Sequence, residues 1–110
     1  MAGFIKGEIV VVPFPFSDLS AVKRRPALVL ADLQGDDIIL CQITSQFNGD
    51  PYAIPITQSN LKSGTLLANS NVRPNRIFTA DSNIIVKSVG VVDDQTLEDI
   101  IKVVIDIISL

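Results

Sequence analysis

Residues 25–46, RPALVLADLQGDDIILCQITSQ, carry the pattern that decides the fold. Two apolar runs, residues 25–32 and residues 37–46, flank a short polar turn at residues 34–36, which is typical of an antiparallel β-hairpin. Pro26 stands near the start of the first run, and a proline is tolerated at the first position of a strand because no ladder N–H is needed there. The sequence therefore predicts two neighbouring strands joined by a tight turn.

Side chains of two kinds alternate along the second strand of this hairpin. A period of two places an apolar set on one face, namely Ile39, Cys41 and Ile43. It places a polar set on the other face, namely Gln42, Thr44 and Gln46. Because successive side chains point to opposite faces, Thr44 is expected to point away from Ile43 and onto a polar surface.

Further strands are predicted on both sides of the hairpin. Residues 8–14 (EIVVVPF) read as a strand that is apolar on both faces, as a central strand is, and Pro13 and Pro15 end it. Residues 52–56 read as an edge strand, since Pro55 interrupts them. The remaining strand candidates are residues 65–68, 72–80 and 84–92.

The strand pattern gives way to a helix pattern at Asp93, a residue suited to the N-cap. Apolar residues then recur at the spacing of one helical stripe: Leu97, Ile100, Ile101, Val104 and Ile108. Five or six short strands followed by one helix predict a mainly β fold. We expect a small barrel or strongly twisted antiparallel sheet with a C-terminal helix packed on it, in a single domain over residues 1–110.

The composition agrees with such a domain and excludes several chemistries. Ile, Val and Leu number 15, 12 and 10 among 110 residues, and this richness in β-branched residues favours sheet over a helical bundle. Histidine is absent, which removes imidazole catalysis and His-based metal sites. Cys41 is the one cysteine, and no apolar run approaches the roughly 18–20 residues of a membrane span. We therefore expect a cytoplasmic protein with no membrane segment, metal or other cofactor.

Charge is unevenly divided along the chain, whose net charge is −3. Residues 93–110 hold five acidic residues and one lysine, so most of the acidity belongs to the predicted helix. In the rest of the chain the basic residues form two clusters. The first consists of Lys23, Arg24 and Arg25, and the second of Arg73 and Arg76. A local basic patch of this kind can hold the phosphates of a nucleic acid.

Five stretches resemble, in consistent order, the MazF/PemK family of toxin endoribonucleases. They are residues 7–10 (GEIV), 24–30 (RRPALVL), 43–45 (ITS), 72–81 (VRPNRIFTAD) and 90–94 (GVVDD). The resemblance implies an SH3-like barrel with a C-terminal helix, a homodimer and an antitoxin partner. It also implies sequence-selective, metal-independent cleavage of single-stranded mRNA that leaves a cyclic phosphate and a 5′-hydroxyl.

By residue match, Arg25 and Thr44 stand at the two catalytic positions that the resemblance implies. The substrate's own 2′-hydroxyl is the nucleophile in such a reaction, so the protein has to align the RNA, stabilise charge and manage protons. Residues expected to bind RNA around these two are Phe16, Lys23, Arg24, Ser45, Gln46, Arg73 and Arg76. An acidic antitoxin segment suits the same basic surface, so we expect antitoxin and RNA to compete.

Interpretations in which the same residues have only a structural role stay open. Arg25 could be a surface residue paired with Asp18 or Asp32. Thr44 could be an ordinary strand-forming residue, and Phe16 could belong to the core.

The chain also departs from the family pattern. Some members carry an acidic residue where this chain has Asn75, and some carry a histidine in the first loop. These departures favour catalysis through Arg25 and Thr44 over catalysis through Arg73 and a carboxylate. Two other functions remain as alternatives: a toxin of the same fold that binds a protein such as gyrase, and an inactive homologue.

Overall fold

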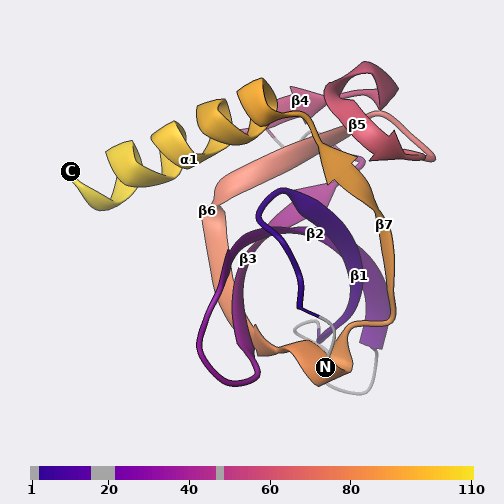
Figure 1. The fold of residues 1–110 in the computed structure, drawn as a ribbon. Coiled ribbons are helices and arrows are strands. Elements are labelled where there is room, and N and C mark those ends of the chain that lie inside the picture. Colours follow the sequence, from indigo (N-terminus) through magenta and orange to yellow (C-terminus); the bar gives the residue numbers. More distant parts are fainter. Residues whose placement is uncertain (1–2, 16–21, 47–48) are drawn as a thin grey trace.

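The structure, a computed structural model, describes residues 3–15, 22–46 and 49–110. Within these residues, seven strands form one antiparallel sheet in the order β4-β6-β3-β2-β1-β7-β5. The sheet curls round on itself, and the C-terminal helix lies across one end of it (Figure 1). The strands are β1 (Glu8–Pro15), β2 (Val22–Asp32), β3 (Asp37–Thr44), β4 (Ile54–Ile56), β5 (Leu61–Gly64), β6 (Ser70–Asp81) and β7 (Lys87–Val92), and the helix is α1 (Asp94–Ile108).

The predicted hairpin is confirmed, because β2 pairs with β3 in antiparallel register from Ala27 opposite Gln42. β2 begins at Val22, earlier than expected, so Pro26 lies inside the strand and the prediction that it starts the strand is wrong. At Pro26 the strand pairs with β1, and the described pairing with β3 begins one residue later. Pro26 thus lies just beyond the described pairing of β2 with β3, a position where a missing N–H is tolerated.

Both faces of β3 are covered, which corrects the expectation of one polar face. Ile43 lies in a core cluster that also contains Ile100 of α1, whereas Leu40 lies in a second cluster with Val12. Thr44 is buried, with 9% of its surface exposed, rather than on a polar surface. The curled sheet covers one face of the strand and α1 and its neighbours cover the other, and a strand's own alternation cannot reveal that second cover.

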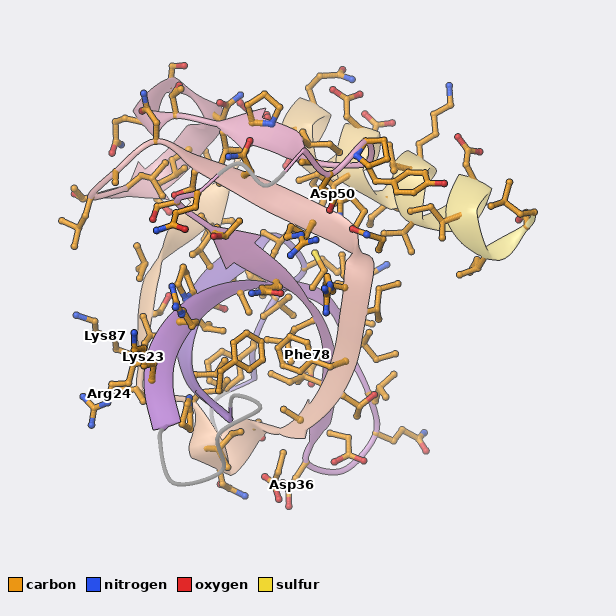
Figure 2. All side chains as sticks on the ribbon, turned by 180° about the vertical axis from the view of Figure 1, so that it is seen from behind. Lys23, Arg24, Asp36, Asp50, Phe78 and Lys87 are labelled. Atoms are coloured by element: carbon orange, nitrogen blue, oxygen red, sulfur yellow. The ribbon has the colours of Figure 1, made fainter. Side chains whose placement is uncertain are left out.

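The two clusters divide the core between them. The inner cluster is joined by Phe14 and Phe78, whose ring centroids lie 4.8 Å apart. Figure 2 shows Phe78 inside the curl of the sheet. The outer cluster is joined by Leu97 and Val104 of α1. β1 supplies both, through Ile9 on one face and Val10 on the other, which confirms the prediction of a central strand apolar on both faces.

The shorter strands differ from expectation. Residues 65–68 form no strand; the strand here is β5, which ends at Gly64. The edge strand containing Pro55 is confirmed at the end of the sheet, although it is shorter than predicted. Gly64 has a φ of 86°, and a Cβ there would lie 2.3 Å from Cα of Gly90. A side chain at this position would therefore block the close approach of β5 to β7.

The predicted helix and its cap are confirmed. The Asp93 carboxylate accepts a hydrogen bond of 2.7 Å from the N–H of Thr96, and this bond holds the pKa of Asp93 below its ordinary value. Ile100 is fully buried, but Ile108 is 71% exposed, so the predicted stripe packs only in its first turns. In the part of the chain that the structure describes, no helix is long and apolar enough to cross a membrane.

Candidate nucleic-acid interface

The sheet register brings the two predicted catalytic residues together. Ala27 of β2 lies opposite Gln42 of β3, and Arg25 and Thr44 stand two residues further along these strands. Continuing the register therefore places Arg25 across from Thr44 and on the same side of the sheet. Arg25 is half-buried, and its Nε atom is fully buried.

The hydroxyl of Thr44 has a defined orientation. Its Oγ1 accepts a hydrogen bond of 3.1 Å from the N–H of Gln46, which closes a local turn at the end of β3. A hydroxyl that accepts in this way keeps its own O–H for donation to another oxygen. Ser45 and Gln46 follow directly and are exposed, so the end of β3 presents polar groups outward.

An open groove of about 450 Å³ lies beside this end of β3. Its cationic lining comes from Arg24 and Arg25 of β2 and from Lys87 of β7, and Ser45 also lines it. Figure 2 shows Lys23, Arg24 and Lys87 at the same flank of the curled sheet. Sequence reasoning missed Lys87, because no local pattern indicates that β7 pairs with β1 on the side away from β2.

Arg73, the next predicted RNA-binding residue, lies in a different environment. Its Nε donates a hydrogen bond of 2.8 Å to Oδ2 of Asp50, and the side chains of Arg73 and Asp50 are only 14% and 4% exposed. Burial alone would raise the pKa of Asp50, but hydrogen bonds from Arg73, from the Tyr52 N–H and from Asn75 outweigh it and hold the pKa below its ordinary value. This ion pair ties the turn after β3 to β6, and no local pattern in the sequence indicates that Asp50 lies against Arg73.

The remaining residues that were predicted to bind RNA either do not line the groove or lie outside the described residues. Arg76 is exposed on β6, at the irregularity where the pairing partner of β3 jumps from Arg73 to Ile77. Lys23 is exposed near the start of β2. Phe16 lies outside the described residues.

Cys41 is part of the core, on the face that it shares with Ile39 and Ile43. Burial raises the pKa of its thiol to about 12, so the thiol stays protonated at neutral pH. It is therefore no nucleophile.

The chain belongs to a family of toxins. The sequence model of the PemK-like, MazF-like toxins of type II toxin-antitoxin systems matches residues 5–108, nearly the whole length. The small curled sheet with a C-terminal helix that the resemblance implies is thereby confirmed as the fold. No curated protein sequence matches the chain.

Solved structures of similar fold include three from bacteria. An endoribonuclease in complex with its cognate antitoxin, from a mycobacterial species, is 17% identical with a TM-score of 0.73, over 100% of this chain and 97% of that one. A chain of the MazE-MazF complex from Deinococcus radiodurans is 18% identical with a TM-score of 0.73, over 96% and 95%. The Mycobacterium tuberculosis toxin MazF-mt6 is 15% identical with a TM-score of 0.67, over 92% and 97%.

Proposed function

We propose that the protein is an endoribonuclease that cleaves single-stranded mRNA at a short sequence. The observation that carries the proposal is the strand register that places Arg25 across from Thr44, in a sheet whose nearby strands also carry the exposed cations Lys23, Arg24 and Lys87. The reaction is attack of the 2′-hydroxyl on the adjacent phosphate, which yields a cyclic phosphate and a 5′-hydroxyl. No metal-bound hydroxide is needed, because the substrate itself provides the nucleophile.

Arg25 is suited to stabilising the phosphorane. A guanidinium stays charged at any physiological pH and offers forked donors that match two phosphate oxygens. A guanidinium is a poor general base, so the role of Arg25 is electrostatic, together with proton donation to the leaving 5′-oxygen. The partial burial of Arg25 strengthens such an interaction, because less water competes for the phosphate.

Thr44 is suited to donating a hydrogen bond to a non-bridging oxygen. The bond that its Oγ1 accepts from Gln46 fixes the rotamer and directs the remaining donor. A donor held in place before the reaction costs no reorganisation as charge develops. Ser45 and Gln46, exposed beside it, are placed to contact the flanking nucleotides.

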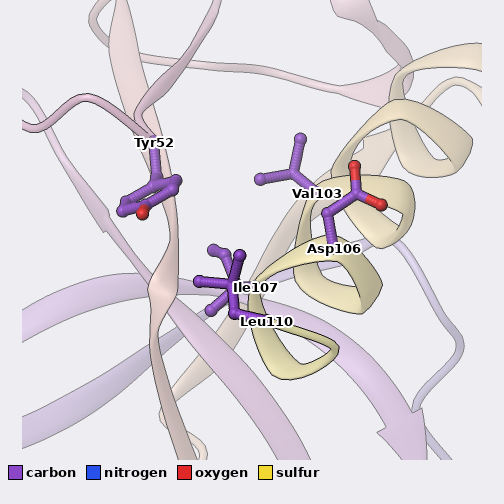
Figure 3. A pocket seen from close by; sticks show the side chains of 5 residues that line it. All are labelled: Tyr52, Val103, Asp106, Ile107 and Leu110. Carbon is purple, nitrogen blue, oxygen red and sulfur yellow. The ribbon is translucent and has the colours of Figure 1, made fainter.

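An antitoxin and a second copy of the chain are the partners that we propose. Basic residues at the groove suit an acidic antitoxin segment, which would then compete with RNA. The end of α1 supports a twofold homodimer: Tyr52 and Leu110 line a cavity of about 160 Å³ there, and they are 40% and 97% exposed (Figure 3). A mass near 24 kDa rather than 11.9 kDa in sedimentation would support the dimer.

The test of the proposed activity is incubation of the purified chain with a mixed RNA in EDTA. We expect fragments with defined ends, each carrying a cyclic phosphate upstream and a 5′-hydroxyl downstream. The same RNA with 2′-deoxy at the scissile nucleotide should stay intact. Intact RNA in the first reaction would refute the proposal and favour a protein-binding toxin or an inactive homologue.

A further inference from the structure

The C-terminal helix is apolar over more of its circumference than the sheet covers. Ile100 of α1 is fully buried, whereas Ile105 and Ile108 are 53% and 71% exposed. Ile101 is turned by about 100° from Ile100 about the helix axis, and Ile105 and Ile108 lie within about 40° of Ile101. The last turns of α1 extend beyond the curled sheet (Figure 1), which leaves this second apolar flank of the helix exposed.

An open groove of about 560 Å³, here called the helix groove, runs along this flank. Its apolar floor consists of Leu97, Ile101 and Ile105, which follow one another at intervals of four residues and span about 12 Å of the helix. A row of side chains at this interval forms the ridge on which a second helix packs. Among the described residues, the helix groove and the cavity at Tyr52 have no lining residue in common.

Negative charge borders the apolar floor. Glu98 and Asp99 line the helix groove, and Lys102 is the one cation among its described lining residues. The side-chain amide of Gln95 donates a hydrogen bond of 2.9 Å to Asp99, so no cation neutralises that carboxylate in this contact. The phosphates of RNA and an acidic peptide are therefore repelled from this flank, whereas a cationic ligand is attracted to it.

A second copy of the chain is a poor occupant of the helix groove. In the part of the chain that the structure describes, α1 is the only α-helix, and residues 93–110 hold five acidic residues and one lysine. A twofold pairing of two such helices through this flank would bring the carboxylates of both copies together. Repulsion between like charges disfavours that pairing, so charge favours a different chain as the occupant.

We propose that the helix groove binds a basic amphipathic helix of a protein partner. The apolar side chains of that helix pack on Ile101 and Ile105, and its flanking lysines or arginines face Glu98 and Asp99. Apolar contact at helical spacing supplies the affinity, and the charges set the orientation of the bound helix. The inference goes beyond the proposed function and does not depend on it, because Arg25 and Thr44 do not line this groove.

The probe for this site is a synthetic peptide of about 18 residues, a length at which a helix can form in isolation. It carries a stripe of leucines flanked by lysines, and its binding to the full chain is measured by calorimetry at several salt concentrations. NMR of the labelled chain locates the contact, and we expect the shifted amides to lie within residues 95–105. A second peptide with glutamate in place of every lysine should bind at least about tenfold more weakly.

Matched variants separate the groove from general attraction. Ile105→Ser should weaken binding by about tenfold, because the side chain is partly buried on binding. Leu67→Ser, at a leucine that is 91% exposed and outside the helix groove, should leave binding unchanged.

Charge is tested in the same way. Glu98→Gln should weaken binding by about threefold and reduce its salt dependence. Asp36→Asn is the control, since Asp36 is exposed in the turn between β2 and β3, far from α1 (Figure 2). Ile105 and Glu98 are exposed, so both variants should fold, which a thermal melt checks.

The outcomes are distinct. Equal affinity of Ile105→Ser and Leu67→Ser, or of the lysine and glutamate peptides, would overturn the proposal. A wild-type dimer that becomes a monomer of 11.9 kDa in Ile105→Ser would show that this flank joins two copies, and would overturn the partner helix. Absence of RNA cleavage by a chain that still binds the peptide at residues 95–105 would refute the proposed function and keep the helix groove.

Discussion

The same dipeptide, Arg-Pro, occurs twice in the chain and has two opposite environments. Arg25, before Pro26, lines an open groove together with Arg24 and Lys87. Arg73, before Pro74, is nearly buried and bound to Asp50 at 2.8 Å. The described residues that line the groove include no carboxylate, whereas in the second region a carboxylate neutralises the guanidinium. The identity of an arginine and its neighbour therefore says little about its role; the partner that the fold brings to it decides.

The largest expected effect is the loss of RNA cleavage when Arg25 is replaced. Arg25→Ala should abolish RNA cleavage, because it removes the guanidinium that we propose binds the phosphate and that the register places across from Thr44. Arg25→Lys, which keeps the charge and loses the fork, should retain a small part of the activity. Cleavage is measured on a defined RNA, with circular dichroism as the check on folding. A folded Arg25→Ala chain that cleaves at the wild-type rate would show that the site is elsewhere.

The next effect is on stability, through the buried ion pair of Arg73 and Asp50. Asp50→Ala should lower the free energy of unfolding by about 3 kcal/mol, at the lower end of the cost of leaving a buried charge unpaired. Denaturant unfolding measures the change. In the double variant Asp50→Ala with Arg73→Leu, part of the loss should return, because no unpaired guanidinium remains. A loss in the double variant that equals or exceeds that of Asp50→Ala would contradict an ion pair that stabilises this turn.

Thr44→Ala should reduce cleavage by about 10- to 1,000-fold, the range for losing one donor to a developing oxyanion. Thr79, exposed on β6, offers the control, and Thr79→Ala should cleave at the wild-type rate. The readout is single-turnover cleavage, which separates the chemical step from RNA binding. Equal rates for the two alanine variants would remove Thr44 from the mechanism.

The pH dependence of stability sharpens the contrast between the regions. The pKa of Asp50 is lower in the folded chain than in the unfolded one, so its contribution is fully present above about pH 4 and is lost as the pH falls through the folded value. The stability difference between the wild type and Asp50→Ala should therefore narrow below about pH 4. Unfolding curves between pH 7 and pH 3 test this, and a constant difference would contradict it.

The smallest effect belongs to an exposed ion pair. Lys62 and Asp94 lie 2.9 Å apart, a distance close to that of the buried pair, but their side chains are 51% and 89% exposed. Lys62→Ala should change the free energy of unfolding by less than about 1 kcal/mol, because water screens the pair. A loss as large as that of Asp50→Ala would mean that burial does not set the strength of these pairs.

Local pattern was enough to predict much of the fold. The hairpin of β2 and β3 follows from two apolar runs around a short turn, and the helix from its stripe and from Asp93 at the N-cap. The prediction at residues 65–68 was wrong because the apolar pair Leu66 and Leu67 lies after the strand, whereas β5 (LKSG) carries little periodic signal and depends on the close approach at Gly64. Thr44 was expected on a polar surface because alternation within one strand cannot show what covers its second face.

The sequence by itself determined most of the strands, their principal turn, the capped helix and the candidates Arg25 and Thr44. These depend on residues close together in the chain, whose spacing fixes which side chains share a face. Only the tertiary structure decided that Lys87 stands at the groove with Arg24, and that Arg73 is held by Asp50, 23 residues away. Such pairs form because the sheet curls and sets β7 beside β1 and the turn after β3 against β6. Their contacts join segments that are far apart in the sequence, so no local spacing of residues can indicate that these segments meet.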